Sequence, residues 1–227
     1  MSQFPDEQVL QDQLAALATT HPSFPYPWND LESFLHEAQM DALPLVGYGS
    51  LINQASAGRT INTDESAKRQ AVAAYGAIRV FNYRMPERFL HERYGSTEEN
   101  KVAALNCEAT GNASDAFNGI LSHVARQHLP ALREREKHYS LKPCLYTPWD
   151  APSDSAEVAY FFELLPNAAI PDHPYDPTVL PHSDYTDICR TGAAAISPDF
   201  LNFFDHTTLL ADKQTTLASY LGLPNAQ

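Results

Sequence analysis

Between residues 43 and 164 the chain carries six short segments rich in β-branched or aromatic residues, with a single helical segment among them. The strand-like segments are 43–48, 71–82, 102–108, 117–124, 142–147 and 157–164. Gly, Asn, Asp or Pro bounds each of them, which favours strands joined by turns. One helix near residues 125–137 does not supply the regular strand–helix alternation of a doubly wound sheet. We therefore predict an α+β fold, in which a small mixed sheet forms a barrel-like structure with flanking helices.

The N-terminal residues show helical rather than strand-like patterns. An apolar stripe at helical spacing begins after Asp6, which is placed to cap it. Asn29 precedes a second stripe, and Glu32 follows three residues later, as in a capping box. We predict a helical extension over residues 1–42, and a compact domain over residues 43–227.

The C-terminal part begins with a proline-rich acidic stretch and then becomes helical. From Pro143 to Cys189 there are eight acidic residues and no Lys or Arg. This stretch is interpreted as a solvated loop and strand edge, with a substrate lid as the functional alternative. Ser183 and Ser197 are placed to cap helices. A last helix is expected to start at residue 205 or 207 and to run through residue 221.

Charge and hydropathy exclude several classes of partner. With 15 basic and 28 acidic residues the net charge is −13, which disfavours nucleic acid and anionic membrane surfaces. No apolar run reaches the roughly 18 residues of a membrane-spanning helix, and no secretory signal is visible. Three sparse cysteines form no close pair, as is typical of reduced thiols. We expect a cytoplasmic protein that acts on a small molecule, and its oligomeric state stays open.

The nine histidines form no recognisable metal site. None of them has the spacing of an H-E-x-x-H helix. His123 and His128 are five residues apart, and no cysteine or carboxylate lies close enough in the sequence to complete a ligand set. We therefore predict neither a metal nor a cofactor.

A glycine-containing turn follows the first predicted strand, at Gly47-Tyr-Gly-Ser-Leu51. It lacks the later glycines and the lysine of phosphate-binding loops, and Tyr48 stands where a nucleophile elbow needs glycine. Ser50 is therefore a poor candidate for a covalent nucleophile. The turn can still present consecutive N–H groups to a carboxylate or an oxyanion. A purely structural turn is the alternative.

The second candidate segment is charged and lies at the end of the helix that interrupts the strands, at Leu132-Arg-Glu-Arg-Glu-Lys-His-Tyr139. A solvated helix end with local ion pairs is the simplest interpretation. However, Glu136 lies four residues after Leu132 and shares its helix face. If Leu132 packs inward, Glu136 points the same way and Glu134 does not.

Together these segments resemble the gamma-glutamylcyclotransferase-like superfamily, which includes gamma-glutamylcyclotransferase, the ChaC glutathione-degrading enzymes and AIG2-like proteins. Residues 46–51 resemble the family's substrate-binding loop, and residues 132–139 its catalytic glutamate motif, with Glu136 at the glutamate. The segment 185–193 is similar to the one that carries an active-site tyrosine. Further likeness to family strands is found at 77–81, 104–106 and 117–120. The resemblance covers roughly residues 43 to 220.

The resemblance implies an enzyme that cyclises a γ-glutamyl amino acid, amine or peptide to 5-oxoproline and releases the amine, without metal or cofactor. It implies Glu136 as the general acid/base. The substrate-binding residues that it implies are Tyr48, Gly49, Ser50, Leu51 and Tyr185. Which γ-glutamyl compound is used, glutathione included, stays open. The alternatives are a catalytically inactive relative that binds a small carboxylate, and an interaction protein that uses the acidic proline-rich loop.

Overall fold

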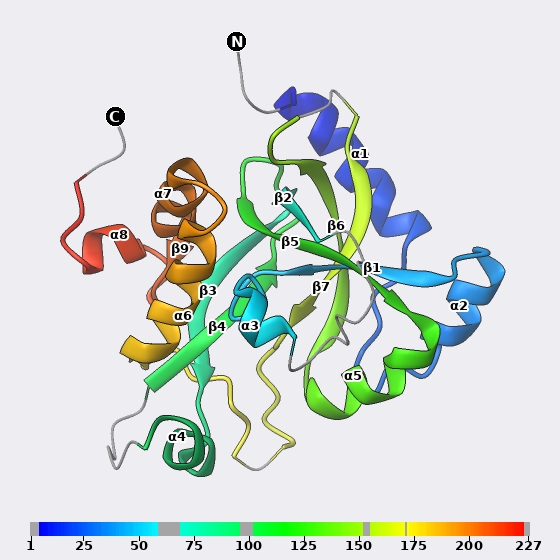
Figure 1. Ribbon diagram of the computed structural model, residues 1–227. Helices are drawn as coiled ribbons and strands as arrows, with labels where there is room; N and C mark the ends of the chain where they lie inside the picture. Colours follow the sequence, from blue (N-terminus) through cyan, green and yellow to red (C-terminus); the bar gives the residue numbers. More distant parts are fainter. Residues whose placement is uncertain (1–4, 59–68, 96–101, 152–154, 171, 225–227) are drawn as a thin grey trace.

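A closed five-stranded barrel and a second, four-stranded sheet form the β structure of the molecule (Figure 1). The computed structural model describes residues 5–58, 69–95, 102–151, 155–170 and 172–224, without the side chain of Arg93. Helices flank the barrel and the second sheet (Figure 1). The predicted α+β class with a barrel-like mixed sheet is confirmed.

The barrel strands follow the order β1, β5, β2, β6, β7 around the ring. Their bounds are β1 Ala42–Gly47, β5 Ala116–Ala125, β2 Gln70–Tyr75, β6 Ser140–Pro148 and β7 Glu157–Glu163. Neighbouring strands are antiparallel, except that β1 and β7 run parallel at Leu45 and Tyr160 and so close the ring. Phe117 and Phe161 are fully buried and meet edge to face, with ring centroids 5.7 Å apart.

The second sheet has the order β8, β4, β3, β9. Its strands are β8 Leu180–Pro181, β4 Val102–Ala109, β3 Ala77–Arg84 and β9 Thr208–Leu209. The segment predicted as one strand over 71–82 is two strands, β2 and β3, which separate at Gly76. Gly76 has φ +90°, a conformation that favours glycine. This break moves the chain from the barrel to the second sheet.

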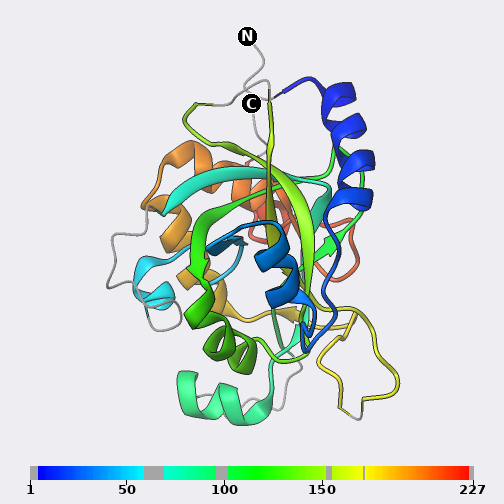
Figure 2. The ribbon, with the colours of Figure 1, turned by 90° about the vertical axis from the view of Figure 1, so that its right-hand side faces the viewer.

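The N-terminal helices are α1 Glu7–Thr20 and α2 Leu31–Glu37. The Asp6 cap is confirmed, because its carboxylate accepts the N–H groups of Gln8 and Val9. The predicted capping box at Asn29 is wrong: α2 is preceded by Asp30, and no side chain caps it. Figure 2 shows α1 along the outside of the barrel, where its buried leucines contribute to the hydrophobic core.

The remaining helices are α3 Gln54–Ala57, α4 Glu87–Tyr94, α5 Leu129–Arg135, α6 Ser183–Ala194, α7 Pro198–Thr207 and α8 Leu217–Tyr220, with a 3₁₀ turn at Arg126–His128. The Ser197 cap is confirmed, but the α6 cap is His182 rather than Ser183. The predicted last helix is wrong in its start, because residues 205 and 207 lie in α7. In the described part of the chain, no helix has the length and apolar character needed to span a membrane.

Candidate active site

The glycine loop, defined here as residues 47–51, leaves the end of β1 and leads into α3. Its glycines are needed for space rather than for unusual dihedral angles. A Cβ on Gly47 would lie 2.6 Å from the Cβ of Leu51, and one on Gly49 would lie 2.5 Å from the hydroxyl of Tyr185. Asn53 then caps α3 by accepting the N–H of Ser56 at 3.1 Å. The loop is therefore packed against neighbours on both sides.

Arg79 on β3 supports the glycine loop from behind. Its side chain is fully buried, and its guanidinium donates to the carbonyls of Tyr48 at 3.4 Å, Asn118 at 2.7 Å and Phe204 at 3.1 Å. Nε donates to the Thr208 hydroxyl at 2.7 Å. Burial lowers the pKa of Arg79 to about 10, so the group stays charged at neutral pH.

Tyr48 anchors the middle of the loop to the barrel. Its ring is buried, and its hydroxyl donates to the carbonyl of Phe162 on β7 at 2.8 Å. Burial raises the pKa of the Tyr48 hydroxyl well above its ordinary value, and the charge of Glu136 adds to the shift. Tyr48 also lines the cavity described below. Its direct contact with a substrate stays a prediction.

Glu136 is the residue at which α5 ends, and its N–H donates to the carbonyl of Leu132 at 2.9 Å. Its side chain keeps only 15% exposure and pairs with Arg135, whose Nε lies 3.3 Å from Oε1. Burial raises the pKa of the Glu136 carboxyl, and Arg135 only partly offsets this. Glu134 is 73% exposed and pairs with Lys137 at 2.5 Å. Of the two carboxylates, Glu136 therefore faces inward.

One cavity of about 1110 Å³ brings the glycine loop and Glu136 together. Its wall also includes residues from β3, α4, β4, β7, α6 and the proline-rich loop. Asp172 and Pro174 contribute from that loop, which is tied to β3 by the hydrogen bond from the Arg84 N–H to the Pro174 carbonyl at 2.7 Å. Gly49 and Glu136 are 87 residues apart in the chain. They nevertheless line the same cavity.

Tyr185 of α6 also lines this cavity, beside Gly49. It is 9% exposed, and its ring meets Phe81 edge to face. Burial raises the pKa of the Tyr185 hydroxyl well above its ordinary value, although hydrogen bonding by the backbone amides of Leu105 and Ser50 lowers it. The hydroxyl therefore contacts the glycine loop. Its contact with a substrate stays a prediction.

Two tyrosines beside Glu136 were not predicted as site residues. Tyr139 and Tyr83 stack with ring centroids 5.5 Å apart and planes at 8°, and both line the cavity. Burial raises the pKa of each hydroxyl, and the Glu136 charge adds to both shifts. Tyr139 stands inside the charged segment, so proximity to Glu136 was a usable signal. Tyr83 carries no comparable signal, because only the stacking of its ring on Tyr139, 56 residues later in the chain, brings it there.

The N-terminal segment 24–28 contacts the far side of the Glu136 turn, defined here as residues 136–139. Trp28 is buried, and its indole Nε1–H donates to the Tyr139 carbonyl at 2.8 Å. The indole also stacks on Phe162, with centroids 5.8 Å apart and planes at 22°. Phe24 exchanges backbone hydrogen bonds of 2.9 Å with Leu141. The boundary between residues 42 and 43 stays a prediction, but the extension contacts the turn that carries Glu136.

Metal-ligating groups are not clustered in the described ranges: among residues 5–58, 69–95, 102–151, 155–170 and 172–224 no three His, Cys, Asp or Glu side chains are arranged to hold an ion. The three cysteines are buried free thiols. Burial raises the pKa of the Cys189 thiol to about 12, so it is not a reactive thiolate at neutral pH. The side chains at the cavity wall supply carboxyl, hydroxyl, imidazole, amine and guanidinium groups, and the glycine loop adds its backbone amides.

The sequence matches no protein-family model and no curated protein. Among solved structures, YkqA from Bacillus subtilis is similar with a TM-score of 0.51 and 15% identity, over 75% of this chain and 55% of YkqA. A gamma-glutamyl cyclotransferase and the human protein loc79017 each give a TM-score of 0.50 and 12% identity, over 72% of this chain and 86% of theirs. This chain spans little more than half the length of YkqA. It has the gamma-glutamylcyclotransferase-like fold, as the motifs predicted.

Proposed function

From this fold and its inward-facing carboxylate, we propose that the protein cyclises a γ-glutamyl amino acid, amine or peptide to 5-oxoproline, with Glu136 as general acid/base. The observation that carries the proposal is the position of Glu136. It is largely buried, its pKa is raised, and it shares a cavity with the glycine loop. A carboxyl group with a raised pKa can both take up and return a proton near neutral pH.

The bond changes are intramolecular. The α-amine nitrogen of the glutamyl group attacks its own γ-carbonyl carbon, and a five-membered ring closes through a tetrahedral intermediate. The bond from that carbon to the leaving nitrogen then breaks, which yields 5-oxoproline and a free amine. Because nucleophile and electrophile belong to one molecule, a site that holds the folded conformer gains an effective molarity on the order of 10⁵ M or more.

Two tasks remain for the protein. The attacking amine must lose a proton, which Glu136 accepts and later returns to the leaving nitrogen. The tetrahedral oxyanion, or the α-carboxylate, needs donors, and the backbone N–H groups of residues 49–51 are proposed for this. One missing donor of this kind costs roughly 10²-fold in rate. Tyr185 and Tyr48 are proposed to help hold the glutamyl group.

The test is production of 5-oxoproline from γ-glutamyl-alanine, γ-glutamylamines and glutathione by the full chain. Glu136→Gln keeps the shape of the side chain but cannot accept the proton, and we expect kcat to fall by about 10²-fold or more. Glu134→Gln is the matched control, because it removes an exposed carboxylate two residues away. It is expected to leave kcat nearly unchanged.

Other results would contradict parts of the proposal. If Glu136→Gln keeps near-full activity and Glu134→Gln loses it, Glu134 is the base. If wild-type protein turns over none of these compounds but binds glutamate-like acids, the protein is an inactive relative that uses the same cavity for binding. If it neither turns over nor binds them, a role in contacting a protein partner takes precedence.

A further inference from the structure

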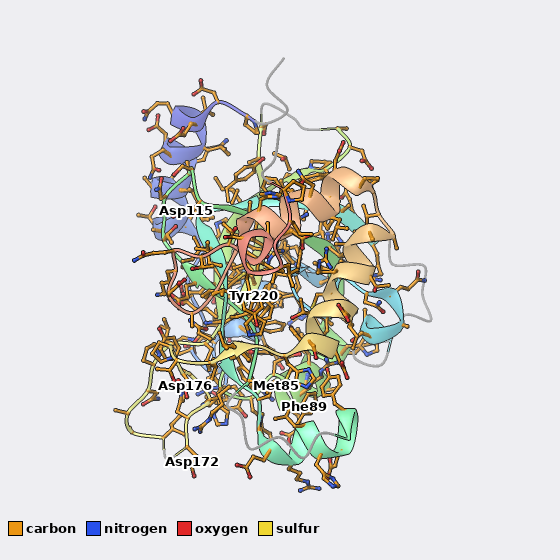
Figure 3. All side chains as sticks on the ribbon, turned by 90° about the vertical axis from the view of Figure 1, so that its left-hand side faces the viewer. Met85, Phe89, Asp115, Asp172, Asp176 and Tyr220 are labelled. Carbon is orange, nitrogen blue, oxygen red and sulfur yellow. The ribbon has the colours of Figure 1, made fainter. Side chains whose placement is uncertain are left out.

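Beyond the glycine loop and Glu136, the cavity extends along α4, and this part of its wall is mostly apolar, with Glu87 as its charged member. Met85, Phe89, Leu90 and Tyr94 line it from the end of β3 and from α4. Met85 and Leu90 are each 3% exposed. Figure 3 shows Met85 and Phe89 close together at this end of the molecule.

Helix α4 has two different sides. Arg88 and Glu92 pair at 2.7 Å with side chains 88% and 60% exposed, so they face solvent. Phe89 and Tyr94 meet edge to face with centroids 6.0 Å apart, and both line the cavity. Phe89 nevertheless remains 38% exposed. An apolar group placed in the cavity would therefore remove apolar area of this ring from water.

The cavity is larger than a γ-glutamyl group needs. Its volume of about 1110 Å³ slightly exceeds the roughly 300–1,000 Å³ that holds drug-sized ligands. A γ-glutamyl group is no larger than one glutamate residue and would occupy only the part between the glycine loop and Glu136. The remaining space lies along α4, whose residues form this part of the wall.

Charge does not single out a charged leaving group. Arg84, Arg135 and Lys137 line the cavity, and so do Glu87 and Asp172. Lys137 is already paired with Glu134. With both signs at the wall, apolar area and size are the features that distinguish one leaving group from another.

We propose that the α4 wall is a leaving-group subsite, and that the preferred substrates are γ-glutamyl compounds whose amine carries a bulky aromatic or branched aliphatic group. The turnover part of the test rests on the proposed function, whereas the binding part does not. The apolar group of the substrate covers Phe89 and Leu90 and loses its contact with water, which favours binding in proportion to the area removed. In apolar pockets even one methylene discriminates by roughly 10-fold or more.

The experiment compares γ-glutamyl-phenylalanine with γ-glutamyl-alanine. The two compounds share the glutamyl group and the α-carboxylate of the leaving amino acid, and they differ by a phenyl ring. We expect kcat/KM to be at least about 10-fold higher for the phenylalanine compound. Calorimetry with the Glu136→Gln protein measures binding without turnover, and we expect Kd to be lower by a similar factor. Phe89→Ala should reduce the preference for the phenylalanine compound over the alanine compound, both in kcat/KM and in Kd. The variant should still fold because Phe89 is partly exposed.

Tyr220→Ala is the matched control, since Tyr220 is another exposed aromatic residue, 45% exposed on α8, away from Phe89 in Figure 3. It should leave the preference in kcat/KM and in Kd unchanged. Turnover of both compounds without a preference, or a preference that Phe89→Ala does not reduce, overturns the subsite and leaves the proposed function standing. No turnover, but tighter binding of the phenylalanine compound that Phe89→Ala reduces, supports the subsite and overturns the proposed function. Neither turnover nor a binding difference overturns both.

Discussion

The glycine loop and the Glu136 turn line the same cavity, but they differ in the hydrogen bonds and ion pairs that hold them in place. The loop rests on Arg79, whose guanidinium donates to carbonyl and side-chain oxygens from β5, α7 and the loop itself. The Glu136 turn accepts a long-range hydrogen bond from Trp28 at the Tyr139 carbonyl, across 111 residues. The Arg79 charge is surrounded by acceptors, whereas within the described part of the chain the Glu136 carboxylate has one ion-pair partner, Arg135, 3.3 Å away.

This difference separates a structural charge from a titratable one. A buried ion with many partners keeps its charge and fixes the groups around it. A buried carboxyl group with few partners has a raised pKa and is available for proton transfer near neutral pH. Arg79 is an example of the first, because its lowered pKa of about 10 still leaves it charged at neutral pH, and Glu136 is an example of the second. The comparison predicts that changes at Arg79 act mainly on stability, that changes at Trp28 act on both stability and rate, and that Glu136 itself opposes folding at neutral pH.

The largest effect on stability is expected from Arg79→Met. This change removes the guanidinium donor from the carbonyls of Tyr48 and Asn118, whereas the Phe204 carbonyl still accepts from Thr208. Each buried carbonyl that loses its donor costs about 1–3 kcal/mol. We expect the free energy of unfolding to fall by about 3 kcal/mol or more, measured by urea denaturation. Arg88→Met, at an exposed ion pair, is the control and should change it by less than about 1 kcal/mol.

If Arg79→Met does not yield folded protein, Arg79→Lys still tests the comparison. It keeps the charge but loses the planar donor fork, so an intermediate loss of stability is expected. A wild-type unfolding curve for either variant would mean that the Arg79 bonds do not hold the loop.

A smaller effect is expected from Trp28→Phe, which keeps an aromatic ring against Phe162 but removes the N–H that donates to the Tyr139 carbonyl. Loss of one such hydrogen bond costs about 1 kcal/mol. If that energy positions the Glu136 turn, kcat should fall about fivefold, with KM little changed. The measurement is steady-state kinetics on the substrate that is turned over best.

The control for this variant is Trp149→Phe, because the chain has two tryptophans. Trp149 packs on Phe200 and Phe203 and does not line the cavity. Equal kcat in wild type and Trp28→Phe would show that the N-terminal segment does not position Glu136. An equal loss of kcat in both variants would point to a general loss of folded protein.

The smallest effect concerns stability as a function of pH. Because burial raises the Glu136 pKa above its ordinary value of 4.5, the native state binds more protons than the unfolded state in the window between the two values. Stability contributed by this group therefore falls as pH rises from 4.5 through the native pKa, and then stays constant. Glu136→Gln lacks this loss, so its stability advantage over wild type should grow with pH.

Urea unfolding of both proteins over this pH range measures the difference, and Glu134→Gln supplies the comparison with an exposed carboxylate. A difference that is independent of pH, or one that shrinks as pH rises, would mean that Glu136 is not held in a desolvated position.

Local patterns predicted the parts of the site that depend on spacing within one element. The four-residue interval from Leu132 to Glu136 predicted the inward carboxylate, and the Gly-x-Gly-Ser order predicted a tight turn after a strand. Patterns of this kind did not predict α4, because half of the residues of Glu87–Tyr94 are charged. They also missed the break at Gly76, since the residues on both sides have the same strand character.

The sequence by itself determined the N-terminal helices, most of the strands, their approximate order and the two motifs that carry the candidate chemistry, because periodicity and turn residues are properties of neighbouring positions. Only the tertiary structure decided which distant groups meet. Barrel closure between β1 and β7, the Arg79 cluster, the bond from Trp28 to Tyr139 and the apolar α4 wall all join residues far apart in the chain. Burial, which raises the pKa of Glu136, likewise depends on every element packed around it and is encoded at no single position.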